Sequence, residues 1–377
     1  MEYTKTNNEL RSVFDPDKND IKIPGSDIRI LNPEFISDSL PNILFNKSDV
    51  SVSENIKFSY PIFVPADKSS KKVIILLHGL NERSWVKYLA WAYYLSLNTG
   101  SYVILFPISF HINRSPVLWK DPRAMLPFLK DRKMTYGEIE MSSFANIALS
   151  KRLTEDPMRF FNSGYRTVCD IVKLMSLIKR GEHTIIPSGS KVNIFAYSIG
   201  AFLAQIILMA NPENLFSDSR LFMFCGGSVF SNMHGTSKLI MDSLAYDKVY
   251  SFYMTDFEEK IKGKSPVVDY LCNSQIGMAF RSMIDLERFR KFRENVLSRV
   301  REQTRSIALS KDSVIPAKGI VKTMNWKTRD KHNPAHIWDF PFPYTHENPF
   351  PIFDTPQSLL VDKSFDRLFS AASLFLA

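Results

Sequence analysis

The sequence predicts an α/β protein with a mostly parallel, doubly wound sheet. Five short, mainly apolar runs alternate with stretches that carry helical patterns. Continuous apolar runs of about four to eight residues suit strands that are covered on both faces, as in a parallel sheet. Alternation of such strands with helices implies that helices cover both faces of the sheet. The expected strands lie at 72–77, 102–106, 192–196, 221–225 and 306–310.

Three segments near these runs are expected to form helices that cover the sheet. Residues 85–97 follow the first run. An apolar stripe at helical spacing extends from Val168 to Ile178, just before the third run. Residues 199–210 are apolar on nearly every side, as a central buried helix is, and Asn211 followed by proline ends them.

The remaining stretches divide the chain. Residues 1–55 are polar and turn-rich, and we expect an N-terminal extension packed on the main domain. Residues 56–227 and 306–377 form the expected core. Two long insertions interrupt the alternation, at 108–163 and at 228–305. We expect the second to form a helical cap or lid over a pocket, because insertions between late strands commonly do so.

The composition is that of a folded, moderately basic protein. Apolar residues make up 45% and charged residues 23%, unlike a disordered chain. The 48 Lys and Arg against 39 Asp and Glu give a net charge of +9, which favours anionic or amphiphilic substrates or membrane surfaces. No nucleic-acid-binding signature accompanies the charge, so we expect no nucleic acid partner.

Part of the positive charge lies in the second insertion, where 287–305 holds seven Arg or Lys against three Glu. Two interpretations of this predicted amphipathic helix stay open: a solvated charged face, or a surface that attracts substrate. Membrane association is a third hypothesis. The apolar stripe of the helix consists of Leu286, Phe289, Phe292, Val296 and Val300.

Neither the chain's beginning nor its cysteines indicate secretion or a metal site. The first residues lack the apolar segment of a signal peptide, and the longest apolar run, 199–210, is too short to span a bilayer. The three cysteines lie far apart, without a C-x-x-C pair. We therefore expect a reduced cytoplasmic protein with no cofactor, no metal and no stable membrane insertion.

The candidate nucleophile is Ser198, which falls between the third expected strand and the central helix. In a nucleophile elbow the serine occupies a strained strand-to-helix turn, with small residues two positions to either side. Ala196 and Gly200 meet that requirement. The alternative is that Ser198 simply caps the helix that follows.

A serine hydroxyl needs a base to take its proton and an acid to orient that base. Asp312 follows the last expected strand, and His346 lies further on, which gives the order serine, acid, histidine. Asp312 has an alternative interpretation as an ordinary turn residue, and His336 is the reserve candidate for the base. An oxyanion hole is expected from the amides of Leu80 and Ile199, because Gly79 follows the first strand and lets the backbone bend toward a reacting carbonyl.

Together, His78-Gly79, the segment 196–200, the segment 311–316 and His346 resemble the α/β-hydrolase superfamily of esterase- and lipase-like serine hydrolases. The resemblance covers residues 60–377, interrupted by the cap, and implies Ser198, Asp312 and His346 as a catalytic triad. The sequence departs from the commonest pattern of the superfamily at Ala196, a position that glycine usually occupies.

Further similarity in the segments 78–85, 110–116 and 344–349 is to a bacterial branch of unknown function, which implies no substrate. The leading hypothesis is hydrolysis of a carboxylic ester or related acyl compound, with a small acyl molecule as partner. The alternatives are acyl transfer or peptide cleavage by the same residues, and a binding protein that keeps the fold without turnover.

Overall fold

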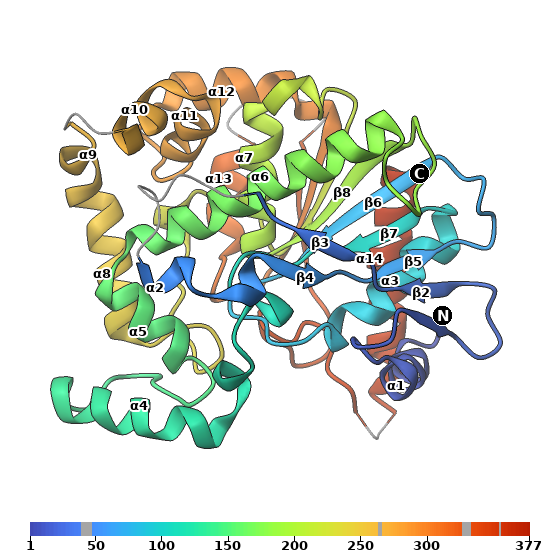
Figure 1. Ribbon diagram of the computed structural model, residues 1–377, viewed down its shortest axis with the longest axis horizontal. Helices are drawn as coiled ribbons and strands as arrows, with labels where there is room; N and C mark the ends of the chain where they lie inside the picture. Colours follow the sequence, from blue (N-terminus) through green and yellow to red (C-terminus); the bar gives the residue numbers. More distant parts are fainter. Residues whose placement is uncertain (39–46, 263–265, 326–332, 354–355) are drawn as a thin grey trace.

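The computed structural model describes residues 1–38, 47–262, 266–325, 333–353 and 356–377. Within these ranges its centre is a nine-stranded sheet in the order β1-β2-β5-β7-β6-β8-β9-β10-β11 (Figure 1). The strands from β7 to β11 in this order run parallel, whereas β1, β2 and β5 pair antiparallel at one edge. A separate antiparallel pair is formed by β3 and β4. The strands are β1 (Asp20–Lys22), β2 (Arg29–Leu31), β3 (Glu34–Ile36), β4 (Lys57–Ser59), β5 (Ile62–Val64), β6 (Lys72–Leu77), β7 (Tyr102–Leu105), β8 (Lys191–Tyr197), β9 (Leu221–Phe224), β10 (Thr304–Leu309) and β11 (Ala335–Trp338).

All five expected strands are present, as β6, β7, β8, β9 and β10, so the predicted mostly parallel sheet is confirmed. Both faces of the sheet are buried. In β6, Ile74 and Leu76 pack into one apolar core, whereas Ile75 and Leu77 pack into the other. This two-sided burial explains why the strands read as continuous apolar runs rather than as alternating ones.

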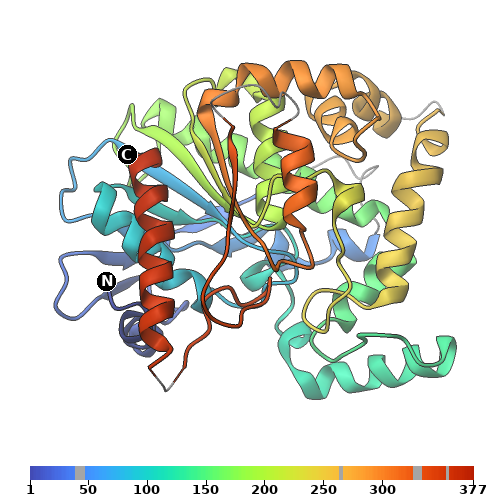
Figure 2. The ribbon, with the colours of Figure 1, turned by 180° about the vertical axis from the view of Figure 1, so that it is seen from behind.

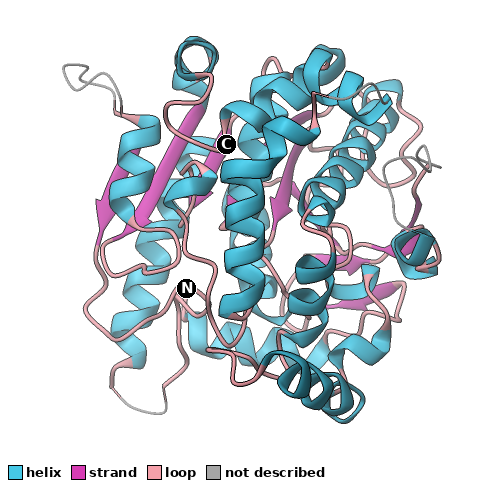
Figure 3. Cartoon of the chain, turned by 90° about the vertical axis from the view of Figure 1, so that its left-hand side faces the viewer, coloured by secondary structure: helices cyan, strands magenta, loops and turns pink. Residues whose placement is uncertain are grey.

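Helices form a layer on each face of the sheet. One layer contains α1, α3 and α14, which pack against one another; Figure 2 shows α14 crossing the sheet, and Figure 3 shows the layered arrangement edge-on. The other layer contains α6, α7 and α13. The helices are α1 (Tyr3–Val13), α2 (Lys47–Val50), α3 (Val86–Thr99), α4 (Pro122–Tyr136), α5 (Ile147–Glu155), α6 (Met158–Arg180), α7 (Ile199–Ala210), α8 (Ser243–Ser251), α9 (Phe257–Lys260), α10 (Pro266–Asn273), α11 (Gln275–Ser282), α12 (Arg290–Arg299), α13 (Ala317–Met324) and α14 (Ser358–Leu376).

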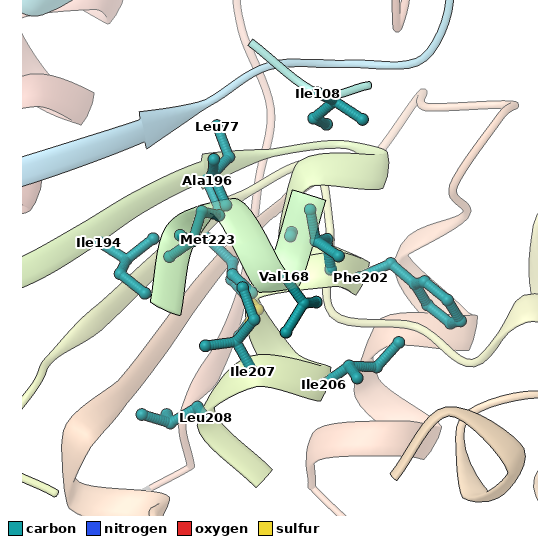
Figure 4. Close-up of a cluster of buried hydrophobic side chains, with 14 of the residues drawn as sticks. Leu77, Ile108, Val168, Ile194, Ala196, Phe202, Ile206, Ile207, Leu208 and Met223 are labelled. Atoms are coloured by element: carbon teal, nitrogen blue, oxygen red, sulfur yellow. The ribbon is translucent and has the colours of Figure 1, made fainter. Parts of the chain in front are cut away.

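The central helix α7 has the bounds that the sequence predicts, and it fixes the position of the site. Every residue of α7 after the first is buried. Figure 4 shows its side chains Phe202, Ile206 and Ile207 among apolar residues of α6 and the central strands, including Ile194. This packing anchors the amino-terminal end of α7 at the carboxyl end of β8.

Both insertions lie on the same side of the sheet. Helices α4 and α5 of the first and α8 to α12 of the second appear at the left and upper left of Figure 1. The described residues of the N-terminal extension supply β1 and β2 to the main sheet. The proposed division at 55, 227 and 305 stays a prediction. No helix among the described residues is long and apolar enough to cross a bilayer.

The predicted basic helix is shorter than expected. It begins at Arg290, because Phe289 has a left-handed φ of 51° that ends helical geometry on its amino-terminal side. The prediction that Leu286 and Phe289 belong to this helix was therefore wrong. Arg290 pairs with Glu287 and Glu294 of the same segment, and this pairing favours a solvated charged face.

Candidate active site

Ser198 occupies a strained turn between β8 and α7. Its φ is 57° and its ψ is −125°, a combination that non-glycine residues rarely adopt. Its side chain makes no capping hydrogen bond to α7, so the helix-cap alternative is not supported. Gly200 shows why a small residue is needed: a Cβ there would lie 2.7 Å from the carbonyl oxygens of both Leu77 and His78. The turn therefore depends on a close approach of α7 to the end of β6.

The three residues predicted as a triad lie together at the carboxyl edge of the sheet. Ser198 Oγ lies 2.7 Å from His346 Nε2, and His346 Nδ1 lies 2.7 Å from Asp312 Oδ2. Asp312 follows β10, the last of the expected strands, and His346 lies beyond the further strand β11. All three side chains are at most 4% exposed. Because a carboxylate only accepts hydrogen bonds, Nδ1 carries the proton and Nε2 accepts from the serine hydroxyl.

Asp312 is oriented by its own loop. Its Oδ1 accepts hydrogen bonds from the backbone N–H groups of Val314 (2.9 Å) and Ile315 (2.8 Å). These two bonds hold the carboxylate in place and leave Oδ2 for His346. The geometry is that of an acid held in place to orient an imidazole, rather than of an ordinary turn residue.

Cys225 lies beside this acid, a placement that no local sequence pattern indicates. Its Sγ, a carboxylate oxygen of Asp312 and a ring nitrogen of His346 lie within 4.8 Å of one another, close enough for a metal ion. Burial, together with the Asp312 charge, raises the pKa of the Cys225 thiol well above its usual range. A metal ligand has to be a thiolate, and Asp312 and His346 are already paired, so the cluster fits a neutral thiol better than a metal centre.

Tyr197 supports the loop that carries His346. The Tyr197 hydroxyl donates a hydrogen bond to the His346 carbonyl oxygen, and the two rings stack with centroids 5.5 Å apart. Burial raises the pKa of Tyr197 well above its usual range, so it remains a donor at neutral pH. Sequence reasoning missed this residue, although its place next to Ser198 was the available signal.

The loop after β6 lies beside Ser198. Leu80 and Ile199, whose amides are the predicted oxyanion donors, line one cavity with Ser198. Neither amide donates a backbone hydrogen bond outside the regular helices and strands of the described chain. His78 fixes this loop: its Nδ1–H donates to Gly79 O at 2.8 Å, and its Nε2 accepts from the Ile108 amide at 2.9 Å.

Two apolar cavities meet at this point. The smaller, of about 490 Å³, is lined by Ser198 and by residues of the second insertion such as Phe230 and Met241. The larger, of about 760 Å³, lies among α5, α6, α7 and α11. The two share three lining residues: Leu80, Phe160 and Ile199. Apolar groups on either side of a reacting carbonyl would therefore have separate compartments.

Other residues noted in the sequence lie elsewhere. His336 is in β11, paired in register with Ile307, so it is not placed beside Ser198. Arg114, in the segment 110–116, is fully buried and forms a 2.7 Å ion pair with Asp170 of α6. This ion pair connects the segment to α6, so we assign the segment a structural role. The basic helix α12 lines neither cavity.

The order of the sheet, the strained strand-to-helix turn at Ser198 and the loops after β10 and β11 define an α/β-hydrolase fold. Within that class, the chain matches the family described as "Family of unknown function (DUF6051)" over residues 39–377, and it belongs to this family. No curated protein is similar to it in sequence at a significant level.

Similar solved structures include a cold-adapted esterase from an Arctic intertidal metagenomic library, with 10% identity and a TM-score of 0.41 over 95% of this chain and 99% of that one. A peroxisomal α/β-hydrolase of Saccharomyces cerevisiae has 12% identity and a TM-score of 0.43, over 93% and 89%. An acylaminoacyl peptidase of Pyrococcus horikoshii has 12% identity and a TM-score of 0.42, over 92% of this chain and 41% of the peptidase. Likenesses this distant are no guide to substrate, so the site is interpreted from its own geometry.

Proposed function

We propose that this protein is a serine hydrolase that cleaves carboxylic esters through an acyl-serine intermediate. The observation that carries the proposal is the unbroken pair of 2.7 Å hydrogen bonds from Ser198 through His346 to Asp312, ending on a serine in a strained turn. Such a chain activates a hydroxyl that is otherwise a poor nucleophile. A core serine with a purely structural role has no need of it.

In the proposed reaction, Ser198 Oγ attacks the ester carbonyl carbon while His346 Nε2 takes the hydroxyl proton. The Asp312 carboxylate stabilises the resulting imidazolium, and the amides of Leu80 and Ile199 hold the negative carbonyl oxygen. The C–O bond to the alcohol breaks, and His346 returns the proton to that oxygen. A water molecule, deprotonated by His346, then releases the acid and restores Ser198.

The lining of the cavities favours apolar substrates. The cavity that contains Ser198 is lined by apolar side chains such as Phe230, Met241 and Val249. A charged group bound there would lose its hydration without gaining a partner. Any anionic part of the substrate would therefore lie away from the reacting carbonyl. Acyl transfer and peptide cleavage use the same residues and differ in the acceptor or the leaving group.

The test is hydrolysis of p-nitrophenyl esters with acyl chains of increasing length, comparing the wild type with Ser198→Ala. We expect turnover by the wild type that rises from acetate to medium chains, because longer chains bury more apolar surface. Ser198→Ala should be inactive with an unchanged melting temperature. Absence of turnover with every ester, in a protein that still binds them, would instead favour the non-catalytic binding protein.

A further inference from the structure

The larger apolar cavity contains a buried polar atom that has no partner. His111 follows β7 and lines this cavity of about 760 Å³, and its side chain is only 5% exposed. Its Nε2 atom has no hydrogen-bond partner among the described residues. Leaving a buried acceptor unpaired costs about 1–3 kcal/mol, so such an atom marks a place where a ligand can supply a donor.

The tautomer of His111 follows from its other nitrogen. Nδ1 lies 2.9 Å from the carbonyl oxygen of Ser109, which can only accept, so Nδ1 carries the hydrogen. Burial lowers the pKa of His111 to about 4, and the ring is therefore neutral at pH 7. Nε2 consequently presents a lone pair and requires a donor.

Nearby polar side chains of the cavity are already bonded to other groups. Ser163 donates to Ser109 O at 2.8 Å, and Arg159 Nε donates to Asp49 at 3.0 Å. Arg152 also lines the cavity and uses one Nη2–H for Asp49 at 3.0 Å; within the described chain its other donors have no hydrogen-bond partner. At this cavity His111 thus presents an acceptor without a described partner, and Arg152 presents a cationic donor.

Arg152 lies close enough to His111 for its charge to lower the pKa of that ring. An acceptor near a cationic donor suits a hydroxyl group. A hydroxyl can donate to an imidazole nitrogen and accept from a guanidinium at the same time. A carboxylate could accept from Arg152, but it would bring its own lone pairs against that of His111. An unsubstituted alkyl chain would leave both groups unsatisfied in an apolar cavity.

We propose that this cavity binds an acyl chain bearing a hydroxyl group, which donates to His111 Nε2 and accepts from Arg152. The inference rests on the proposed ester hydrolysis, because the cavity is lined by Leu80 and Ile199, which also line the cavity of Ser198 and carry the proposed oxyanion donors. It narrows the substrate class from apolar acyl esters to hydroxyacyl esters.

The test measures binding separately from turnover. Methyl octanoate, its isomers with a hydroxyl on each of carbons 3 to 8, and the monomethyl ester of octanedioic acid are titrated calorimetrically into Ser198→Ala protein. We expect one hydroxyl position to bind about tenfold more tightly than the unsubstituted ester, the gain of one additional satisfied hydrogen bond. No preference at any position, or a preference for the carboxylate, would overturn the proposal.

Two further variants in the Ser198→Ala background assign the effect to His111. Replacing His111 by Phe removes the acceptor and should abolish the hydroxyl preference, whereas His111→Gln keeps an acceptor oxygen and should retain part of it. His336→Phe is the matched control, since His336 lies in β11 away from the cavity, and it should keep the full preference. A preference that survives His111→Phe in a protein with native circular dichroism would contradict the assignment.

Turnover by the wild type separates the two proposals. Hydrolysis of p-nitrophenyl octanoate without any hydroxyl preference in binding would leave the proposed function standing and reject this inference. A hydroxyl preference in binding without hydrolysis of any ester would support the proposed hydroxyl-binding cavity and reject the proposed hydrolysis.

Discussion

The loops after β6 and after β11 both bring a buried histidine to the carboxyl edge of the sheet, but they bond it differently. Among the described residues, His78 forms hydrogen bonds only with backbone groups: Nδ1 donates to Gly79 O, and Nε2 accepts from the Ile108 amide. His346 instead lies between a carboxylate and a serine hydroxyl. The comparison shows that the partners of a buried imidazole, rather than its burial, decide whether it can exchange a proton with a reacting group.

The charges around the two rings reinforce this difference. Burial lowers the pKa of His78 well below its usual range, and the nearby His111, Lys87 and Arg114 lower it further. A proton added to His78 would therefore be opposed from several sides. His346 instead has the Asp312 carboxylate 2.7 Å from its Nδ1 atom. The first ring is a fixed brace for the loop after β6, and the second is the base in the proposed reaction.

Removal of His346 tests the difference between the two histidines most severely. His346→Ala leaves Ser198 without a base, so ester hydrolysis should fall by at least about 10⁴-fold. Initial rates with a p-nitrophenyl ester measure the effect. Activity within tenfold of the wild type would mean that another group takes the serine proton.

Asp312→Asn should have the next largest effect. The amide nitrogen or oxygen can still fill the space, but an uncharged group neither fixes the His346 tautomer nor stabilises its imidazolium. We expect kcat to fall by about 10³–10⁴-fold. If kcat is unchanged while KM rises, Asp312 affects binding rather than proton transfer, and the triad assignment is wrong.

His78→Leu should act on stability more than on chemistry. It leaves the buried Ile108 amide without an acceptor, which should cost about 1–3 kcal/mol of unfolding free energy. Hydrolysis should slow by about tenfold, because the oxyanion loop loses its tie to β7. Urea unfolding measures the first effect. A loss of activity as large as that of His346→Ala, in a fully stable protein, would remove the distinction between the two histidines.

The smallest effect is expected in the pH dependence of the unfolding free energy. The pKa of His111 is lowered to about 4, below the usual value near 6.5, so the unfolded chain binds a proton more readily than the native one. Stability is therefore complete above pH 6.5 and falls as the pH decreases toward 4. Between pH 7 and 5 this single group should cost about 1–2 kcal/mol.

Urea titrations at both pH values check this effect, using His111→Phe for comparison. The variant should lose less stability than the wild type between pH 7 and 5. Equal losses in the two proteins would mean that His111 is protonated as readily in the native state as in the unfolded chain.

The sequence was sufficient for features that burial alone specifies. The β6 and β8 runs are continuous because both faces of the sheet are covered, and α7 has its predicted bounds because no polar face interrupts 199–210. Ser198 and Asp312 could be selected from the sequence because each directly follows a recognisable apolar strand. His346 could be selected because it lies further along the chain, as the order serine, acid, histidine requires.

Features that depend on non-local contacts could not be predicted. β1 and β2 have three residues each and are strands because they pair at the edge of the sheet. The start of α12 depends on one left-handed residue, Phe289. The unpaired nitrogen of His111 arises from the meeting of several helices around a cavity, which no local pattern encodes.

The most direct test of the central claim, that Ser198 is an activated nucleophile, is covalent labelling with a fluorophosphonate probe followed by intact-mass and peptide analysis. We predict a single adduct on Ser198 in the wild type, none in Ser198→Ala, and strongly slowed labelling in His346→Ala. An adduct on another residue, or equal labelling of wild type and Ser198→Ala, would contradict the account.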